Sequence, residues 1–226
     1  MNMRTYKNLK YNINSETIHL MQSLSKPGIS VEEYRQVFYS IGTALGNLLN
    51  ETTHNNYGNT MLACASEDAD WLAHGVLDAL SQKKVSLAVF WNDRVSLNVP
   101  AKLEYSPISK SYIEPITDCQ TLIMVKSIIN TSCVIRTQLT RLVNNICPQK
   151  IYIVAPVMYK DAQSNLEKEF PLSISAKFKF LTFAIDTVID DQNNIIPGIG
   201  GKVYPKLGLG DHKNKYIPNL VKERLQ

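Results

Sequence analysis

The chain has 226 residues, of which 44% are hydrophobic and 19% are charged, and its formal net charge is +4 at pH 7. This composition excludes an intrinsically disordered chain and is typical of a globular protein that buries a full core. No apolar run approaches the roughly 20 residues of a membrane-spanning helix. The polar first residues also lack the apolar core of a secretory signal. We therefore expect a cytoplasmic protein without a membrane partner.

The cysteines and the charge distribution add two expectations. Cys64, Cys119, Cys133 and Cys147 show no spacing typical of a metal site, so free thiols and no bound metal are predicted. Residues 202–226 contain six cationic and two acidic side chains, and this difference of four equals the whole net charge. Such a basic C-terminal tail can bind a protein or nucleic-acid partner, or it can serve solubility alone.

The N-terminal part predicts two helices. In residues 31–49 apolar side chains recur every three or four positions, and Ser30 with Glu33 forms a capping box. A second helix is expected from Ser66, whose hydroxyl can cap it, to Leu80. Its acidic run at 67–70 suits the positive end of the helix dipole, which is a commoner use of such residues than a metal cluster.

From residue 85 onward, apolar strands alternate with helices. Strands are predicted at 85–90, 121–125, 151–154 and 178–185, and helices at 132–147 and 161–170. The proline-broken stretch at 98–119 is irregular and is either a loop or a hairpin. This alternation indicates an α/β fold with a mainly parallel sheet and helices on both faces. Ligands bind at the carboxyl ends of such strands. The loops after residues 90, 125, 155 and 185 are therefore expected to face one crevice.

Two polar loops are candidate binding sites. The loop 126–132 leads into a helix that opens with the hydroxyls of Thr131 and Ser132, and the free N–H groups of a helix start bind anions. An ordinary strand–helix connection with capping hydroxyls has the same pattern. Asp93 and Arg94 directly follow a buried strand. They suit a ribose hydroxyl and a phosphate, although a local salt bridge in a turn is the alternative.

Four segments, in this order, resemble the uracil phosphoribosyltransferases, which are type I phosphoribosyltransferases. They are HLMQSLSKPGISVEEYRQVFYSIGTALGNLLNE from residue 19, LIMVKSIINTSCVI from 122, IYIVAPVMYKDAQSNLEKEFP from 151 and FLTFAIDTVIDDQNNIIPGIGG from 180. The resemblance implies a type I phosphoribosyltransferase-like sheet with an N-terminal helical arm, and a homodimer. We expect a single domain over 1–226, with the arm and its helix in 1–65 and the basic tail in 202–226.

The resemblance also implies roles for particular residues. Thr131 and Ser132 would hold the 5′-phosphate of phosphoribosyl pyrophosphate (PRPP). Asp93 and Arg94 lie where the family binds pyrophosphate, and together with Lys126 they would form a rebuilt diphosphate or ribose site. The base would be held by main-chain groups of a turn, which comprises Ile196, Pro197, Gly198, Gly200 and Gly201.

The chain departs from the family pattern in its PRPP loops. Lys126 stands where the family carries an Asp that accepts hydrogen bonds from the ribose. A lysine has donors only, and it would repel the Mg²⁺ that accompanies a diphosphate. Ser132 and Cys133 replace two glycines, and Gly201 replaces an Asp. No cofactor is therefore certain, Mg²⁺ is expected only if PRPP is a substrate, and no residue is assigned a catalytic role.

Three functions remain open. The first is a divergent uracil phosphoribosyltransferase-like protein with degenerate PRPP loops that binds a nucleobase, a nucleotide or a sugar-phosphate. Any activity would be pentosyl transfer at the anomeric carbon. The second is a catalytically silent regulator or effector in a bacterial stress or antiphage module, such as a retron. The third is a conventional uracil salvage enzyme.

Overall fold

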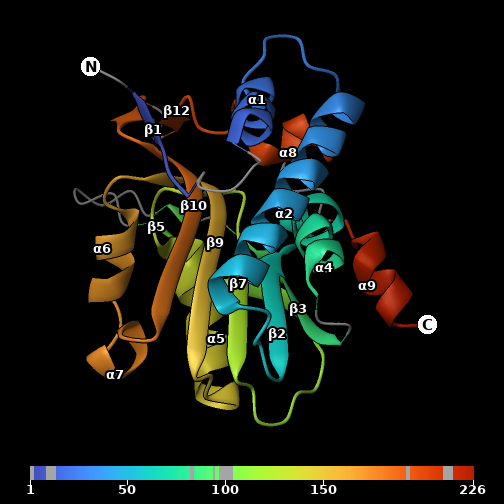
Figure 1. The fold of residues 1–226 in the computed structure, drawn as a ribbon, viewed down its shortest axis with the longest axis vertical. Helices are drawn as coiled ribbons and strands as arrows, with labels where there is room; N and C mark the ends of the chain where they lie inside the picture. The colour runs from blue at the N-terminus through green and yellow to red at the C-terminus, as the bar shows by residue number, and fades with distance from the viewer. Residues whose placement is uncertain are drawn as a thin grey trace.

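A mixed eight-stranded sheet forms the middle of the protein, as the computed structural model in Figure 1 shows. The structure describes residues 3–8, 14–81, 84–93, 95–96, 104–191, 194–210 and 216–226. The strand order is β1-β10-β9-β7-β2-β3-β6, and β8 pairs with β9. The strands of this sheet are β1 (Arg4–Tyr6), β2 (Thr60–Ala65), β3 (Val85–Asn92), β6 (Ile108–Ile113), β7 (Thr121–Val125), β8 (Ile128–Ile129), β9 (Lys150–Tyr159) and β10 (Phe178–Asp186).

The inner strands are parallel and the two edge strands, β1 and β6, are antiparallel to their neighbours. Two short ladders lie outside the sheet, β4 (Val95–Ser96) with β5 (Glu104–Tyr105) and β11 (Val188–Ile189) with β12 (Ile195–Ile196). The helical segments are α1 (Asn14–Leu24), α2 (Val31–Thr53), α3 (Ser66–Asp68), the π-helix η1 (Ala69–Ala73), α4 (His74–Ala79), α5 (Cys133–Ile146), α6 (Ala162–Lys168), α7 (Leu172–Ser175), α8 (Val203–Lys206) and α9 (Asn219–Arg224).

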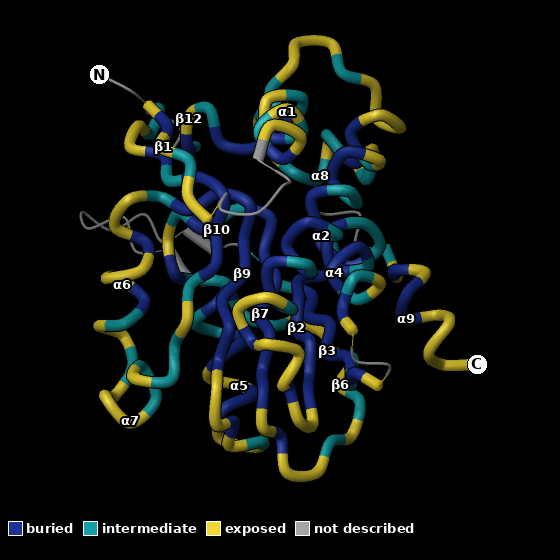
Figure 2. The backbone as a smooth tube through the Cα atoms, viewed as in Figure 1, coloured by how far each residue is buried: buried dark blue, intermediate teal, exposed yellow. Residues whose placement is uncertain are grey.

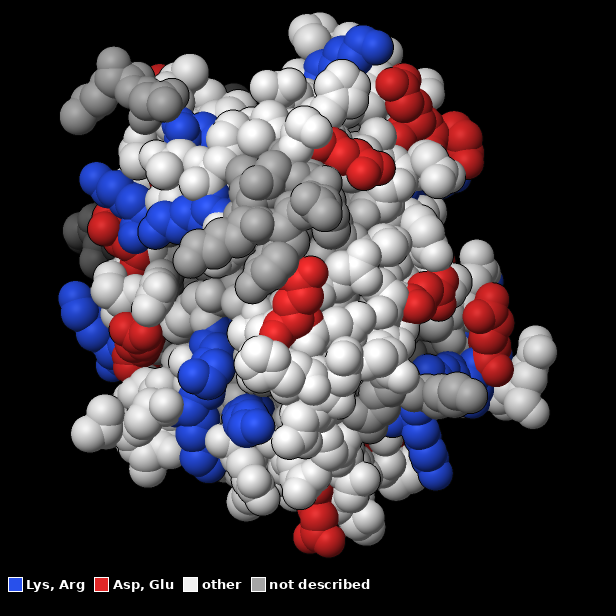
Figure 3. Space-filling model, viewed as in Figure 1, with Lys and Arg blue, Asp and Glu red and all other residues white. Residues whose placement is uncertain are grey.

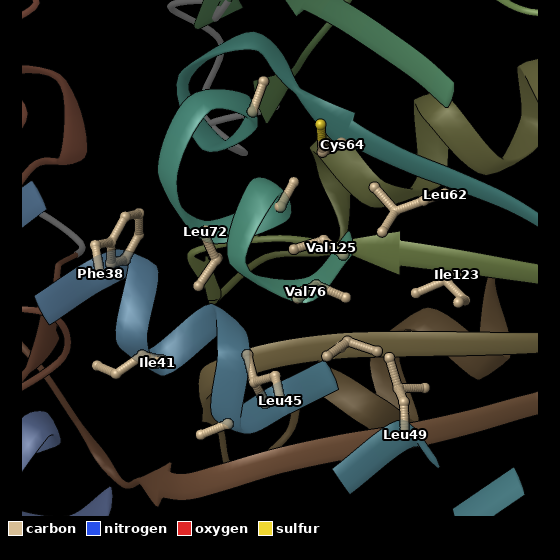
Figure 4. Close-up of a cluster of buried hydrophobic side chains, with 14 of the residues drawn as sticks. Phe38, Ile41, Leu45, Leu49, Leu62, Cys64, Leu72, Val76, Ile123 and Val125 are labelled. Atoms are coloured by element: carbon tan, nitrogen blue, oxygen red, sulfur yellow. The ribbon is translucent and has the colours of Figure 1, made fainter. Parts of the chain in front are cut away.

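Both faces of the sheet are covered, because the central strands send alternate side chains to two separate cores. In β2, Leu62 and Cys64 join the core beneath α2, whereas Met61 and Ala63 join the core beneath α5. Figure 2 shows these strands as the buried centre of the molecule. Figure 4 shows the first core, in which the apolar stripe of α2 meets β2, β7 and α4. The predicted α/β fold, with a mainly parallel sheet, helices on both faces and a helical arm, is confirmed.

The predicted capping of the two N-terminal helices has different outcomes. Ser30 caps α2, since its Oγ accepts from the Glu33 N–H at 3.1 Å. The second helix is interrupted by the π-helix η1, and Ser66 does not cap it. The Oγ of Ser66 is instead buried without a hydrogen-bond partner among the described residues. A cap needs a hydroxyl beside the first N–H groups, and Ser66 already lies inside the first turn.

The C-terminal segment 216–226 packs on the domain and is not a free tail. The Asp70 carboxylate accepts from the N–H groups of Asn219 and Leu220, both at 2.9 Å, and so caps α9. Leu220 and Val221 are buried. Lys213 and Lys215 lie outside the described residues. Basic side chains also gather far from α9, on the left of the face shown in Figure 3, over β10 and α6.

None of the described helices combines the length and the apolar character that crossing a membrane requires.

Candidate functional site

The connections of the sheet diverge between β2 and β7. These neighbours pair in parallel, but the chain leaves β2 toward β3 on one side and leaves β7 toward β9 on the other. In an open parallel sheet such a switch point forms a crevice outside the carboxyl ends of the strands, where ligands bind. The segments at this point are α3 directly after β2 and residues 126–132, which include β8, after β7. We call this place the switch-point crevice.

A buried ion cluster joins the two segments of the crevice. Lys126 Nζ lies 2.6 Å from Asp68 Oδ2 and 3.1 Å from Glu67 Oε1. It also donates to Ser127 Oγ at 3.0 Å. The Lys126 side chain is only 8% exposed and that of Asp68 is fully buried. The ammonium therefore points from the loop after β7 to the carboxylates after β2, and we call these residues the Lys126 cluster.

Two carboxylates share one ammonium in this cluster, and the pKa values reflect it. Burial and the neighbouring Glu67 raise the pKa of Asp68 to about 6, although Lys126 opposes this shift. Burial would lower the pKa of Lys126, but Asp68 and Glu67 outweigh it and hold that pKa above its ordinary value. Lys126 is thus charged at neutral pH, and its charge is compensated from within the protein.

Aromatic side chains from β3, α8 and the C-terminal segment lie near the cluster. The Tyr216 hydroxyl donates to the Ser66 carbonyl at 2.7 Å, and the Trp91 Nε1–H donates to the Tyr216 carbonyl at 2.9 Å. The Tyr204 hydroxyl donates to Glu67 Oε2 at 3.3 Å. Burial raises the pKa of both tyrosines. Tyr216 of the C-terminal segment therefore lies beside α3 and the end of β3.

The start of α5 already holds a carboxylate. Ser132 Oγ donates to Glu169 Oε1, and Arg136 Nη1 pairs with Glu169 Oε2 at 3.1 Å. The Ser132 side chain does not cap the helix backbone. Its hydroxyl donates to the Glu169 carboxylate instead. Thr131 is exposed, while Ser132 is buried. The predicted phosphate position is thus occupied by an anionic group of the protein itself.

The second predicted loop lies one strand away. Asp93 follows β3, which pairs with β2 and not with β7. Its N–H donates to the Pro107 carbonyl at 2.9 Å. Arg94 lies outside the described residues. Among the described residues, those that pair with the Lys126 ammonium are therefore in α3, directly after β2.

The predicted base-binding turn uses its main-chain groups within the protein. The Gly198 N–H donates to Asp186 Oδ2 at 2.9 Å, and the Gly198 carbonyl accepts from Arg4 Nη2 at 2.5 Å. The Ile199 carbonyl accepts from the Tyr34 hydroxyl at 3.0 Å. Gly200 has a φ of +80°, and a Cβ at this position would overlap the Leu24 carbonyl. The turn is therefore locked to β1, β10, α1 and α2.

The other three predicted residues of that turn are more exposed. Ile196 is among the exposed large apolar side chains, and Pro197, which follows a cis peptide bond, is partly buried. Gly201 has a φ of +126°. The structure thus places Ile196, Pro197, Gly198, Gly200 and Gly201 in one turn, as expected from their closeness in the chain. Within the described residues, the hydrogen bonds of this turn do not reach the Lys126 cluster.

Sequence reasoning missed Ser66, Glu67 and Asp68 as members of the crevice. The acidic run was assigned to a helix dipole, and the strand before it, β2, was not predicted. An apolar strand followed at once by SED is the signal that would have found them, because the carboxyl end of a parallel strand faces the crevice.

Comparisons with known proteins identify the fold and no closer relationship. No protein-family model matches the chain, and no curated protein matches it. The AQ2163 protein from Aquifex aeolicus is similar in structure, with a TM-score of 0.66, 15% identity and coverage of 85% of this chain and 93% of that one.

Two further solved structures have lower scores. A hypothetical protein from Neisseria gonorrhoeae with bound ppGpp gives a TM-score of 0.47 at 10% identity, over 76% of this chain and 94% of that one. Orotate phosphoribosyltransferase from Mycobacterium tuberculosis in complex with PRPP gives 0.44 at 10% identity, over 74% and 89%. At such identities a likeness concerns the fold alone.

Proposed function

We propose that the protein binds the phosphate group of a nucleotide or sugar-phosphate at the start of α5 and does not transfer ribose phosphate from PRPP. The observation that argues against transfer from PRPP is the Lys126 cluster, and the one that supports the phosphate site is the contact of Ser132 and Arg136 with Glu169. At the position where the uracil phosphoribosyltransferases have an acidic residue for the ribose, this chain has an ammonium that is paired with Asp68 and Glu67.

The residues of the crevice do not fit a PRPP-bound Mg²⁺. A divalent cation in such a site needs carboxylate or water oxygens as ligands. The two carboxylates beside Lys126 already accept from its ammonium at 2.6 and 3.1 Å. A metal would have to displace a buried cation, so no step of the proposed function passes through one.

The phosphate position is supported by the contacts of Glu169. A carboxylate that accepts from a hydroxyl and pairs with an arginine at a helix start marks a place where negative charge is stabilised. A ligand phosphate would offer more acceptor oxygens to Ser132 and Arg136 than Glu169 does. We infer that binding exchanges the internal carboxylate for the phosphate.

Glu169→Gln is expected to raise the affinity for ribose 5-phosphate or UMP about tenfold, because the ligand no longer competes with a tethered anion. Isothermal titration calorimetry without Mg²⁺ measures the change. Glu167→Gln, which removes an equal charge two residues away, is the control and should leave the affinity unchanged. Equal affinities for the two variants, or no binding to any of the three proteins, would refute the phosphate site.

The second candidate is a catalytically silent regulator, and the internal pairing of Lys126, Ser132 and Gly198 favours it. Its partner, a protein or nucleic acid, would bind through the basic C-terminal region. Uracil as the base and a homodimer are proposals that come from the resemblance. A role in antiviral defence is a proposal by analogy with degenerate relatives of the family, and the cytoplasm is a proposal from the polar N-terminal residues and the lack of a long apolar run.

Both candidates predict that the protein incubated with uracil, PRPP and Mg²⁺ forms no UMP above a protein-free blank. A chromatographic assay with an active salvage enzyme as positive control checks this. Formation of UMP would instead establish the conventional salvage enzyme and would show that the Lys126 cluster opens for PRPP.

A further inference from the structure

Basic and aromatic residues alternate around the start of β10, in the sequence Lys177-Phe178-Lys179-Phe180. We call these four residues the KFKF edge. β1 pairs with β10 only at residues 184–186, and beyond β1 the Asn8 side chain donates to the Thr182 carbonyl at 2.9 Å. Within the described residues, no strand pairs with the KFKF edge on the side away from β9. This part of β10 is therefore an open edge of the described sheet.

The lysines of this region lie on the same face of the sheet as α2. Lys179 is two residues before Leu181, and Lys150 of β9 is two residues before Tyr152; both of those apolar residues belong to the core beneath α2. Successive side chains of a strand point to opposite faces, so Lys150 and Lys179 share that face. Both are exposed, and neither forms an ion pair with a described carboxylate. Figure 3 shows basic side chains gathered over β10.

The phenylalanines of the KFKF edge lie on the opposite face of the sheet. Phe178 and Phe180 pack at the border of the core beneath α5, with their ring centroids 6.1 Å apart in an edge-to-face arrangement. Phe170 packs edge-on against Phe178, with ring centroids 5.5 Å apart. Both rings of the KFKF edge are partly exposed. Such rings are a platform on which the bases of a single strand stack, since every base has a π face.

The backbone of the KFKF edge adds hydrogen-bond donors. The Ile151 N–H donates to the Lys177 carbonyl at 3.0 Å. Bonding to a neighbouring strand alternates along the chain, so Lys177 and Lys179 direct their main-chain groups toward β9. The Thr182 carbonyl, which accepts from Asn8, agrees with this alternation. The N–H groups of Phe178 and Phe180 are therefore directed to the open edge.

We propose that the KFKF edge binds a single-stranded nucleic acid. The phosphates lie against the ammonium groups of Lys150, Lys177 and Lys179, and the bases stack on the two phenylalanine rings. Lys177 is half-buried, and its ammonium donates to the Pro148 carbonyl at 2.9 Å. An anionic membrane fits this surface less well, because the rings lie on the face opposite the lysines and would not enter the bilayer that the lysines approach. The proposal uses neither the start of α5 nor the C-terminal segment.

The test titrates the full chain with fluorescent oligo(dT) and oligo(U) of about 12 nucleotides, followed by fluorescence anisotropy at several KCl concentrations. Three phosphate contacts by a single strand predict a slope of roughly −2 for the logarithm of the binding constant against that of the salt concentration. Saturable binding of either oligonucleotide with such a slope is expected, and the tighter one distinguishes DNA from RNA. No binding to either, equal binding of a duplex, or binding only to anionic phosphatidylserine vesicles would overturn the proposal.

Charge variants locate the phosphate contacts. Lys179→Gln should weaken binding and make the salt slope less negative by about 0.7, the value for one phosphate of a single strand. Lys222→Gln removes an equal charge from an exposed position on α9, and it should leave the slope unchanged. Equal effects of the two substitutions would mean that only the overall charge attracts the oligonucleotide, which contradicts a site at the KFKF edge.

Ring variants test the stacking. Phe180→Leu keeps an apolar side chain but removes the ring, and it should weaken binding about tenfold at constant salt slope. Phe170→Leu is the matched control, since it removes a ring that packs against Phe178 but does not belong to the KFKF edge. It should leave the affinity nearly unchanged. Unaltered binding by Phe180→Leu, or an equal loss in both variants, would refute stacking on this edge.

Discussion

Replacement of Lys126 by methionine is expected to lower the free energy of unfolding by about 3–5 kcal/mol, because it leaves two carboxylates without their shared cation. Asp68 is fully buried, and its Oδ1 has no hydrogen-bond partner among the described residues even with Lys126 present. Methionine fills a similar volume, so the loss reports the charge and not a cavity. Urea unfolding followed by circular dichroism measures it.

Lys179→Met is the matched control for Lys126→Met. Lys179 lies exposed on β10, and its replacement should change the free energy of unfolding by no more than about 0.5 kcal/mol. Adding Asp68→Asn to Lys126→Met should recover part of the loss, since it removes the fully buried unpaired carboxylate. A cost below about 1 kcal/mol for Lys126→Met would mean that water reaches the cluster and screens it.

Arg4→Met is expected to cost about 3 kcal/mol or more, because the Asp186 carboxylate would remain buried with only one strong donor, the Gly198 N–H. The Arg4 side chain is 8% exposed and Asp186 is fully buried. The change also removes the donor to the Gly198 carbonyl. The hydrogen bond from the Arg4 side chain that joins β1 to the turn at 196–201 is therefore lost. Thermal and urea unfolding measure the effect.

Arg141→Met is the control, since Arg141 lies exposed on α5, and it should be nearly neutral. NMR amide shifts of residues 196–201 should change in Arg4→Met and remain unchanged in Arg141→Met. If the two variants were equally stable, the Arg4–Asp186 pair would contribute no more than its desolvation costs, and the turn would be held by its other contacts.

The elements that the sequence predicted well are those with a local physical cause. The period of apolar residues over 31–49 corresponds to α2, and the uninterrupted apolar run at 121–125 is β7. Both patterns depend only on which faces of the helix or strand are buried. They can therefore be recognised in the sequence without knowing which elements pack against them. The chain order of strands and helices likewise predicted a mainly parallel sheet. Strand β2 was missed, because six apolar or small residues can belong to either a strand or a helix.

The partners of the polar residues could not be predicted in this way. Lys126 was recognised as an unusual residue, but Asp68 and Glu67 lie 58 and 59 positions away in the chain. Glu169 lies 37 positions from Ser132. Only the pairing of β2 with β7 and the position of α6 bring these groups together. The same holds for Arg4 and Asp186, which are 182 positions apart.

By itself, the sequence determined the α/β class, the main helices and strands and the loop from which Lys126 projects, since these depend on periodicity and on local backbone preferences. The tertiary structure alone decided that the lysine charge is neutralised within the crevice, that a carboxylate occupies the start of α5 and that the base-type turn is tied to β1. Those outcomes depend on distances between side chains from different strands, and such distances exist only once the sheet has formed.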